Sequence, residues 1–107
     1  MREIDVCPVS ELPAGSVRIV PVESFLAIGV YNCGGELYAL EDRCSHDDGP
    51  LCEGVFDCEE KVATCPRHGA RFDITTGRPL SLPAYLPVET YAVRVRDEDG
   101  VVVVAVP

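Results

Sequence analysis

The feature that most constrains this chain is the placement of its two histidines, each of which stands within three residues of a cysteine. The first pair has the spacing Cys44-x-His46, the second has Cys65-x-x-His68, and eighteen residues separate the pairs. Donors two or three residues apart can reach one metal centre from a single tight turn. The spacing therefore predicts two turns that face each other and share a metal.

Two other interpretations of these four residues remain open on spacing alone. The histidines can be ordinary surface side chains and the cysteines small buried apolar ones. Two cysteines and two histidines are also a standard tetrahedral set for a structural zinc ion.

The sequence outside these turns has the pattern of β-strands. Apolar and polar residues alternate with a period near two in Ser16–Val20 and Glu36–Leu40, and a continuous apolar run fills Phe25–Tyr31. Gly34-Gly35 separates two of these runs and predicts a hairpin turn. No segment longer than about ten residues keeps an apolar helical stripe free of Pro and Gly. We expect an all-β, mainly antiparallel fold.

A second hairpin is predicted near the C-terminus, where Asp97–Gly100 separates the runs 91–95 and 101–105. The acidic residues of this turn lack the further ligands of a calcium loop, so they indicate a polar turn. Between about residues 43 and 83 the chain is dense in Cys, Gly, Pro and acidic residues. We expect one domain, residues 1–107, with a basal β part (about 1–42 and 84–107) and a loop-built insert (about 43–83).

Charge and cysteine content narrow the possible functions. Nine basic against eighteen acidic residues give a net charge of -9, which argues against nucleic-acid binding. The charged first residues do not resemble a signal peptide, and no apolar run of about eighteen residues is present. We therefore expect a cytoplasmic protein without membrane contact. A reducing compartment favours ligation or burial over disulfides for its six cysteines.

The residues around the two Cys/His pairs resemble a known signature. Segments 44–46, 65–73 and 76–77 read CSH, CPRHGARFD and TG, which is similar to the Rieske [2Fe-2S] motif. The resemblance extends over nearly the whole chain and is strongest to the ferredoxins of bacterial ring-hydroxylating dioxygenases. It implies an antiparallel Rieske-type β-sandwich with a small cluster-binding subdomain inserted.

The resemblance also implies a ligand set for one [2Fe-2S] cluster. Cys44 and Cys65 would bind the inner iron, and His46 and His68 the outer iron, at the solvent edge. With two thiolates the site carries zero charge when oxidised and -1 when reduced, so adding an electron costs less than with four thiolates.

Four neighbouring positions place the chain within the Rieske group. High-potential members join their two cluster loops by a disulfide, and here the corresponding residues are Gly49 and Arg67. Those members also have a serine and a tyrosine, where this chain has Ala70 and Phe72. Because these hydroxyls would stabilise the reduced cluster, their absence predicts a potential low in the Rieske range of roughly -150 to +300 mV.

Four cysteines lie outside the two Cys/His pairs. Cys52 and Cys58 lie in what the sequence indicates is a solvent-side connection, where a disulfide or an accessory ligand is an open alternative. Cys7 and Cys33 are expected to be small filler near strand ends. The acidic groups 47–48 and 57–60 are a solvated face or a docking surface, and the loop 77–83 resembles the proline-bearing segment that covers the cluster in the family.

The expected function is one-electron transfer without catalysis, since both histidines are committed to iron and no nucleophile has a base. The resemblance implies a monomeric carrier that takes electrons from a flavin-dependent reductase and gives them to a terminal oxygenase, as a transient protein partner of each. A small Rieske subunit of a nitrite reductase and a zinc-stabilised interaction module remain as alternatives.

Overall fold

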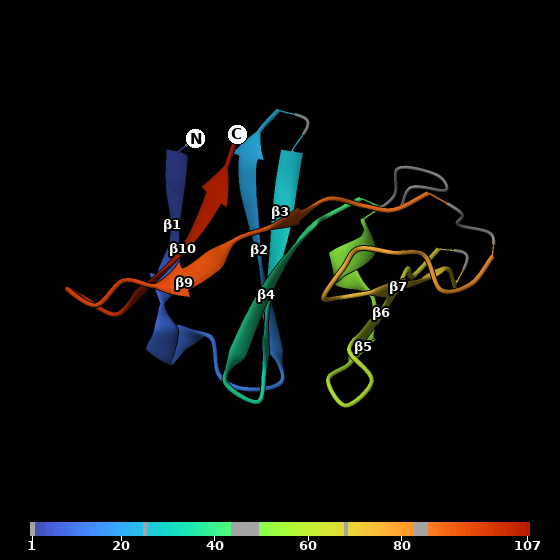
Figure 1. Cartoon of the computed structure of the whole chain (residues 1–107), viewed down its shortest axis with the longest axis horizontal. Helices are drawn as coiled ribbons and strands as arrows, with labels where there is room; N and C mark the ends of the chain where they lie inside the picture. The colour runs from blue at the N-terminus through green and yellow to red at the C-terminus, as the bar shows by residue number, and fades with distance from the viewer. Residues whose placement is uncertain (1, 25, 44–49, 68, 83–85) are drawn as a thin grey trace.

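The structure is a computed structural model that describes residues 2–24, 26–43, 50–67, 69–82 and 86–107. The described strands form three antiparallel sheets (Figure 1). The first sheet has the order β1-β10-β9 and contains β1 (Arg2–Pro8), β10 (Val101–Val106) and β9 (Val93–Val95). The second has the order β2-β3-β4-β8 and contains β2 (Ser16–Glu23), β3 (Leu26–Cys33), β4 (Glu36–Glu41) and β8 (Thr90–Tyr91). The third has the order β5-β6-β7 and contains β5 (Phe56–Asp57), β6 (Val62–Thr64) and β7 (Arg71–Asp73).

This architecture confirms the predicted all-β antiparallel fold and both predicted hairpins. β3 and β4 pair across Gly34-Gly35, and β9 and β10 pair across the acidic turn 97–100. Two short 3-10 helices, η1 (Val9–Glu11) and η2 (Leu51–Glu53), are the helical elements of the described chain. Within the described residues, no helix is long and apolar enough to cross a membrane.

The prediction of one strand over residues 91–95 is wrong. Leu40 pairs with Thr90 in the second sheet, whereas Val104 pairs with Val93 in the first, and the Ala105 amide donates to the Ala92 carbonyl at 2.9 Å. The chain therefore changes sheets at Ala92. A short crossing of this kind leaves the apolar alternation intact, so periodicity alone does not reveal it.

The expectation of an insert built of loops also needs correction. β5, β6 and β7 form a sheet of their own beside η2, to the right of the two basal sheets in Figure 1. Each of these strands is only two or three residues long. A strand that short does not show a period of two, which is why the sequence did not predict it.

Two hydrophobic cores lie on the two faces of the second sheet. The basal core packs β3 and β4 against the first sheet, and its buried members are Cys7, Leu12, Ile28, Val30, Ala39, Val102, Val104 and Val106. The second core joins the sheet to the β5–β7 unit, and its buried members are Tyr31, Leu40, Leu51, Cys52, Ala63, Cys65, Ala70, Phe72, Ile74 and Val88. Because β3 contributes to both cores, its apolar run is nearly continuous.

A disulfide between Cys33 and Cys58 joins the basal part to the β5–β7 unit, with Cα atoms 5.1 Å apart. The prediction that Cys33 is filler is therefore wrong, and the general preference for ligation or burial over disulfides does not hold for this pair. Cys58 does form a disulfide, the alternative left open for it, but its partner lies outside the insert. The Cys7 side chain is buried in the basal core, as predicted.

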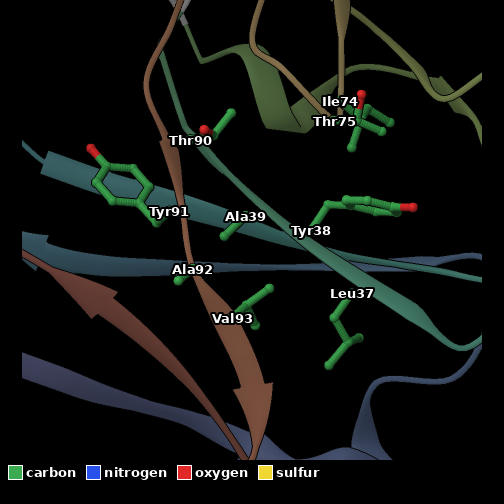
Figure 2. A pocket seen from close by; sticks show the side chains of 9 residues that line it. All are labelled: Leu37, Tyr38, Ala39, Ile74, Thr75, Thr90, Tyr91, Ala92 and Val93. Carbon is green, nitrogen blue, oxygen red and sulfur yellow. The ribbon is translucent and has the colours of Figure 1, made fainter.

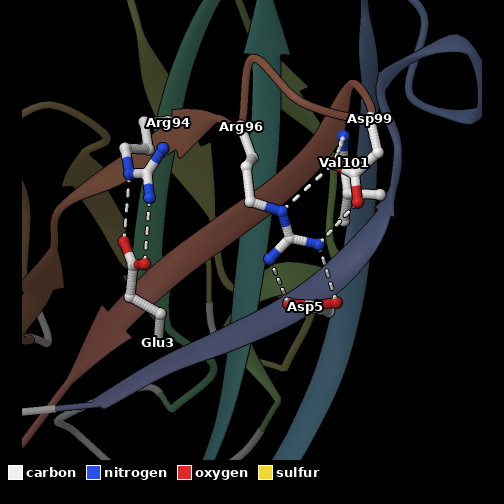
Figure 3. Close-up of polar contacts among 6 residues, drawn as sticks. All are labelled: Glu3, Asp5, Arg94, Arg96, Asp99 and Val101. Carbon is white, nitrogen blue, oxygen red and sulfur yellow. Dashed lines mark hydrogen bonds and ion pairs between the residues drawn. The ribbon is translucent and has the colours of Figure 1, made fainter.

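Ion pairs cross the outer face of the first sheet (Figure 3). The Arg94 guanidinium donates two hydrogen bonds to the Glu3 carboxylate, both at 3.0 Å. The Arg96 guanidinium donates to Asp5 at 3.1 and 3.2 Å, and to Asp99 at 3.1 and 2.8 Å. These contacts connect β1 to β9 across β10 and fix the polar turn that the sequence predicted.

Candidate metal centre

Cys65 is the predicted ligand that the structure describes, and it lies in the connection between β6 and β7. The Cys65 amide donates to the Ala70 carbonyl at 2.8 Å, and the Gly69 amide donates to the Cys65 carbonyl at 3.1 Å. Gly69 has a φ of +74°, a backbone conformation that glycine adopts without steric cost. The motif residues thus form a closed turn that holds the cysteine in place.

The Cys65 thiol is 1% exposed and is not in a disulfide. It packs in the second core, among apolar side chains. A buried thiol at the start of a rigid hairpin turn fits an inner-iron ligand, because the turn fixes the sulfur and the core excludes water. The donor chemistry and the position of this residue therefore agree with the predicted cluster.

The other three predicted ligands, Cys44, His46 and His68, lie outside the described residues. The segments that flank residues 44–49 are described, and they meet. The Asp42 carboxylate accepts a hydrogen bond from the Cys52 amide at 2.7 Å, and the Asp42 amide donates to the Ala27 carbonyl at 2.8 Å. The chain therefore leaves the sheet at residue 42 and returns beside the same residue, next to the core that contains Cys65.

η2 follows this return and packs closely on β3. A Cβ atom added to Gly29 would overlap both the Sγ and the Cβ of Cys52. Leu51 and Cys52 are 0% and 1% exposed, so the expectation of a solvent-side connection is wrong for these two residues. η2 can lie this close to β3 because Gly29 has no side chain. No pattern in the sequence indicated this contact.

Burial also changes the pKa of the Cys52 thiol. Desolvation raises the pKa of its thiol to about 12, and the neighbouring Asp42 charge contributes in the same direction. Without a bound metal the thiol is therefore protonated at neutral pH, and a metal that reached it would bind it as the thiolate. The alternative of Cys52 as an accessory ligand therefore stays open.

The sequence singled out four positions near the predicted ligands, and two of them lie in the same core as Cys65. Ala70 and Phe72 are both 0% exposed and belong to the same core as the thiol. Neither side chain has a hydroxyl to donate to sulfur. Gly49 lies outside the described residues, and Arg67 follows Cys65 in an exposed part of the turn.

The loop that was expected to cover the cluster runs along β7. Phe72 and Pro79 form an isolated β-bridge, and the Leu80 amide donates to the Arg71 carbonyl at 2.7 Å. Leu80 and Leu82 are 50% and 79% exposed. The segment therefore extends the small sheet and carries apolar side chains on its surface.

An open cavity of about 340 Å³ lies between β4, the β8–β9 segment and the residues after β7 (Figure 2). Its lining residues are Leu37, Tyr38, Ala39, Ile74, Thr75, Thr90, Tyr91, Ala92 and Val93. No cysteine, histidine or carboxylate is among them, so this cavity is not the metal site. Across the described parts of the chain, no group of three or more metal-binding side chains comes together.

Comparison with known proteins gives consistent matches. Residues 2–92 match the profile of a family described as the Rieske [2Fe-2S] domain. The 3-phenylpropionate/cinnamic acid dioxygenase ferredoxin subunit of Escherichia coli (strain K12) is 38% identical over 99 residues, which cover 92% of this chain and 91% of that protein.

Solved structures extend this similarity to the fold. The ferredoxin of carbazole 1,9a-dioxygenase from Nocardioides aromaticivorans IC177 superposes with a TM-score of 0.89 at 33% identity, and the match covers 98% of each chain. A chain in a complex of reduced oxygenase and oxidized ferredoxin in carbazole 1,9a-dioxygenase has a TM-score of 0.87 at 36% identity, covering 96% of this chain and 92% of that one.

Proposed function

The chain belongs to the Rieske [2Fe-2S] domain family, and on that premise we propose that it is a one-electron carrier whose cluster is bound by Cys44, His46, Cys65 and His68. Family membership confirms the predicted cofactor and the Rieske-type fold. The relatives are ferredoxin subunits, in agreement with an electron-transfer component that is not itself an enzyme. The observation that carries the ligand proposal is the buried Cys65 thiol in its closed turn.

The described residues have clear roles around such a cluster. When bound, a Rieske cluster accepts and releases one electron at a time. Cys65 supplies a sulfur from a turn that its own backbone hydrogen bonds hold rigid. Ala70 and Phe72 exclude water on the core side, and the Asp42–Cys52 hydrogen bond holds together the two ends of the segment that carries Cys44 and His46.

The proposed partners are a flavin-dependent reductase and the terminal oxygenase of a ring-hydroxylating system. Support comes from relatives that are named as dioxygenase ferredoxins, one of them in a complex with an oxygenase. The β5–β7 unit and the loop after it also expose large apolar side chains, namely Val55, Leu80, Leu82 and Leu86. Apolar side chains on an acidic surface suit brief docking, in which charge governs the encounter rate more than the affinity.

The ligand proposal is tested with a matched pair of variants. Cys65→Ala and Cys52→Ala each remove one buried thiol from the same core. We expect the Cys65 variant to lose iron, acid-labile sulfide and the visible absorbance, and the Cys52 variant to retain all three. His46→Ala and His68→Ala should also lose the Rieske electron paramagnetic resonance signal. A colourless wild-type protein that contains zinc and no labile sulfide would establish the zinc module instead.

The proposed carrier role is tested by mixing the reduced protein with a terminal oxygenase. Anaerobically reduced protein should pass its electron to a ring-hydroxylating terminal oxygenase within one turnover, and should co-elute with it only weakly in gel filtration. Stable co-purification with a nitrite reductase would favour the nitrite reductase subunit. The relatives named above favour the dioxygenase system.

The proposal includes a low potential, for which Phe72→Tyr is the test. A hydroxyl bonded to cluster sulfur would stabilise the reduced state by roughly 1.4 kcal/mol, which corresponds to roughly 59 mV for one electron. We expect the midpoint to rise by about this amount, and Ala70→Ser to act in the same direction. A clearly positive midpoint in the wild-type protein would refute the reasoning.

The domain division, the monomeric state and the cytoplasmic location also stay proposals. The β5–β7 sheet lies within the proposed insert 43–83, which supports the division into basal and cluster-binding parts. Gel filtration and cell fractionation test the other two.

A further inference from the structure

The Cys33–Cys58 disulfide lies outside the proposed ligand set and joins two separate parts of the molecule. Cys33 ends β3 in the basal part, and Cys58 follows β5 in the cluster-binding part. Their Cα atoms are 5.1 Å apart, which is within the normal range for a disulfide. Cys33 is 5% exposed, whereas Cys58 is only half-buried, so Cys58 is the more accessible of the two cysteines.

Both cysteines are positioned by turns that do not depend on the bond. Beside Cys33, the buried Asn32 side chain donates to the Leu12 carbonyl at 2.7 Å and accepts from the Gly35 amide at 2.9 Å. Beside Cys58, the Asp57 carboxylate accepts from the amides of Glu59 and Glu60 at 2.8 and 3.2 Å. The two sulfurs therefore stay close when the bond is broken.

When the disulfide is reduced, the Cys58 thiol has a hydrogen-bond acceptor within reach. The Asn32 carbonyl oxygen lies 3.8 Å from the Cys58 Sγ, so a Cys58 thiol donates to it without movement of the backbone. Both the bonded and the open form are thus compatible with the same fold. This compatibility is what a reversible couple requires and a purely structural cross-link does not.

The segment that the disulfide closes contains half of the proposed ligand set. It runs from residue 33 to residue 58 and includes Cys44 and His46. A cross-link restrains the open conformations of the segment between its ends. Breaking the bond therefore removes a restraint on the segment that contains half of the proposed ligand set.

From this geometry we infer that Cys33 and Cys58 form a second redox site, a two-electron dithiol/disulfide couple that controls how firmly the cluster is retained. A small dithiol reductant attacks the Cys58 sulfur, and the second thiol of the reductant then resolves the mixed disulfide. The protein S–S bond breaks, an S–S bond forms in the reductant, and two electrons and two protons pass to Cys33 and Cys58. The reverse reaction with the oxidised reductant restores the bond. The coupling to the cluster rests on the ligand set proposed above.

Carboxylates surround the site and set its selectivity. Glu36 pairs with Cys33 in the β3–β4 register, and Asp57, Glu59 and Glu60 flank Cys58. Two cations lie near these carboxylates: Lys61 follows Glu60, and the Arg71 guanidinium pairs with the Glu60 carboxylate at 3.7 Å. The negative charge that remains disfavours the approach of an anionic thiol. The attacking thiolate of dithiothreitol carries one negative charge and that of glutathione carries two, so dithiothreitol is expected to open the bond faster at equal thiolate concentration, with a difference that shrinks at high salt.

The first experiment titrates the thiols of the purified holoprotein. Samples are equilibrated with mixtures of reduced and oxidised dithiothreitol, denatured in the presence of a chelator and alkylated. The mass of the intact protein is then measured by mass spectrometry. We expect a reversible loss and gain of two alkyl adducts, and Cys58→Ser should abolish it, whereas Cys7→Ala should not. Failure of oxidised dithiothreitol to remove two adducts would overturn the inference.

The second experiment measures cluster loss to an iron chelator from the visible absorbance. We expect loss to accelerate by about tenfold after reduction of the disulfide. Cys58→Ser and Cys33→Ser/Cys58→Ser should match the reduced rate without any reductant, and Cys7→Ala should match the oxidised rate. Equal rates in the oxidised and reduced coloured protein would overturn the coupling. A colourless protein with intact thiol exchange would instead refute the proposed ligand set.

Discussion

The close approach of η2 to β3 gives a sharp test of how the fold supports the metal site. Gly29→Ala adds one methyl group where the Sγ and Cβ of Cys52 already lie. In an extended strand the change from Gly to Ala would by itself stabilise the fold by about 0.4–1 kcal/mol. Overpacking of a close-packed core costs about 1–3 kcal/mol, so the clash outweighs the gain.

We expect a net loss of about 1–2 kcal/mol, which lowers the Tm of a domain of this size by roughly 4–16 °C. Leu51 and Cys52 are buried, so the strain is relieved by displacement of η2. Since η2 follows the segment that carries Cys44 and His46, the variant should also release its cluster to a chelator faster than the wild type. Thermal unfolding by circular dichroism and visible absorbance measure the two effects.

Cys52→Gly removes both atoms that clash with the new methyl group, and it completes a double-mutant cycle. Gly29→Ala/Cys52→Gly should be more stable than the sum of the two single effects predicts, by about 1 kcal/mol. A Gly29→Ala protein as stable as the wild type, or a strictly additive cycle, would refute the proposed contact between η2 and β3.

Three further substitutions test local features. Burial raises the pKa of the Tyr31 hydroxyl, and the neighbouring Cys52 thiol adds to this, but the hydroxyl makes no hydrogen bond of good geometry in the described part of the chain. Tyr31→Phe should therefore leave the Tm unchanged or raise it; a lower Tm by calorimetry would show that the hydroxyl bonds to the thiol. The hydrogen bond from the Thr75 hydroxyl, at 2.6 Å, lowers the pKa of Asp73 below its ordinary value, so its contribution to stability is present above about pH 4 and is lost as the pH falls through the folded pKa. Asp73→Asn should therefore flatten the acid side of the stability profile measured by urea unfolding. Asn32→Ala should cost about 2–3 kcal/mol in urea unfolding, because a buried carbonyl and an amide lose their partners; a cost below about 0.5 kcal/mol would contradict that role.

Much of the basal fold could be predicted from the sequence because its strands are long enough to show a period. β2, β4 and β10 lie where alternation or an apolar run indicated them, and two turns marked by glycine separate the predicted hairpin partners. The β5–β7 strands could not be predicted, since two or three residues do not make a pattern. The crossing at Ala92 was missed for a related reason, because both sheets require the same alternation.

The sequence indicated which residues are candidate ligands, but it did not indicate most of the packing around them. Cys65 stands out in the sequence through its spacing from His68, and the structure places it in a buried turn. The partnership of Cys33 with Cys58 had no such signal, because a disulfide depends on the distance between two turns that the sequence does not specify. The same applies to Gly29 and Cys52, whose contact exists only after β3 and η2 have packed.

β3 belongs to both cores, with Ile28 and Val30 on the basal side and Tyr31 on the side of Cys65. The cluster-binding part is thus not a module that could be cut out and grafted onto another protein, because one wall of its interior is a strand of the base. Any transplant would have to carry the β3–β4 hairpin with it. Because neighbouring residues of that single strand face the two different cores, a shift of its backbone would alter the packing of both.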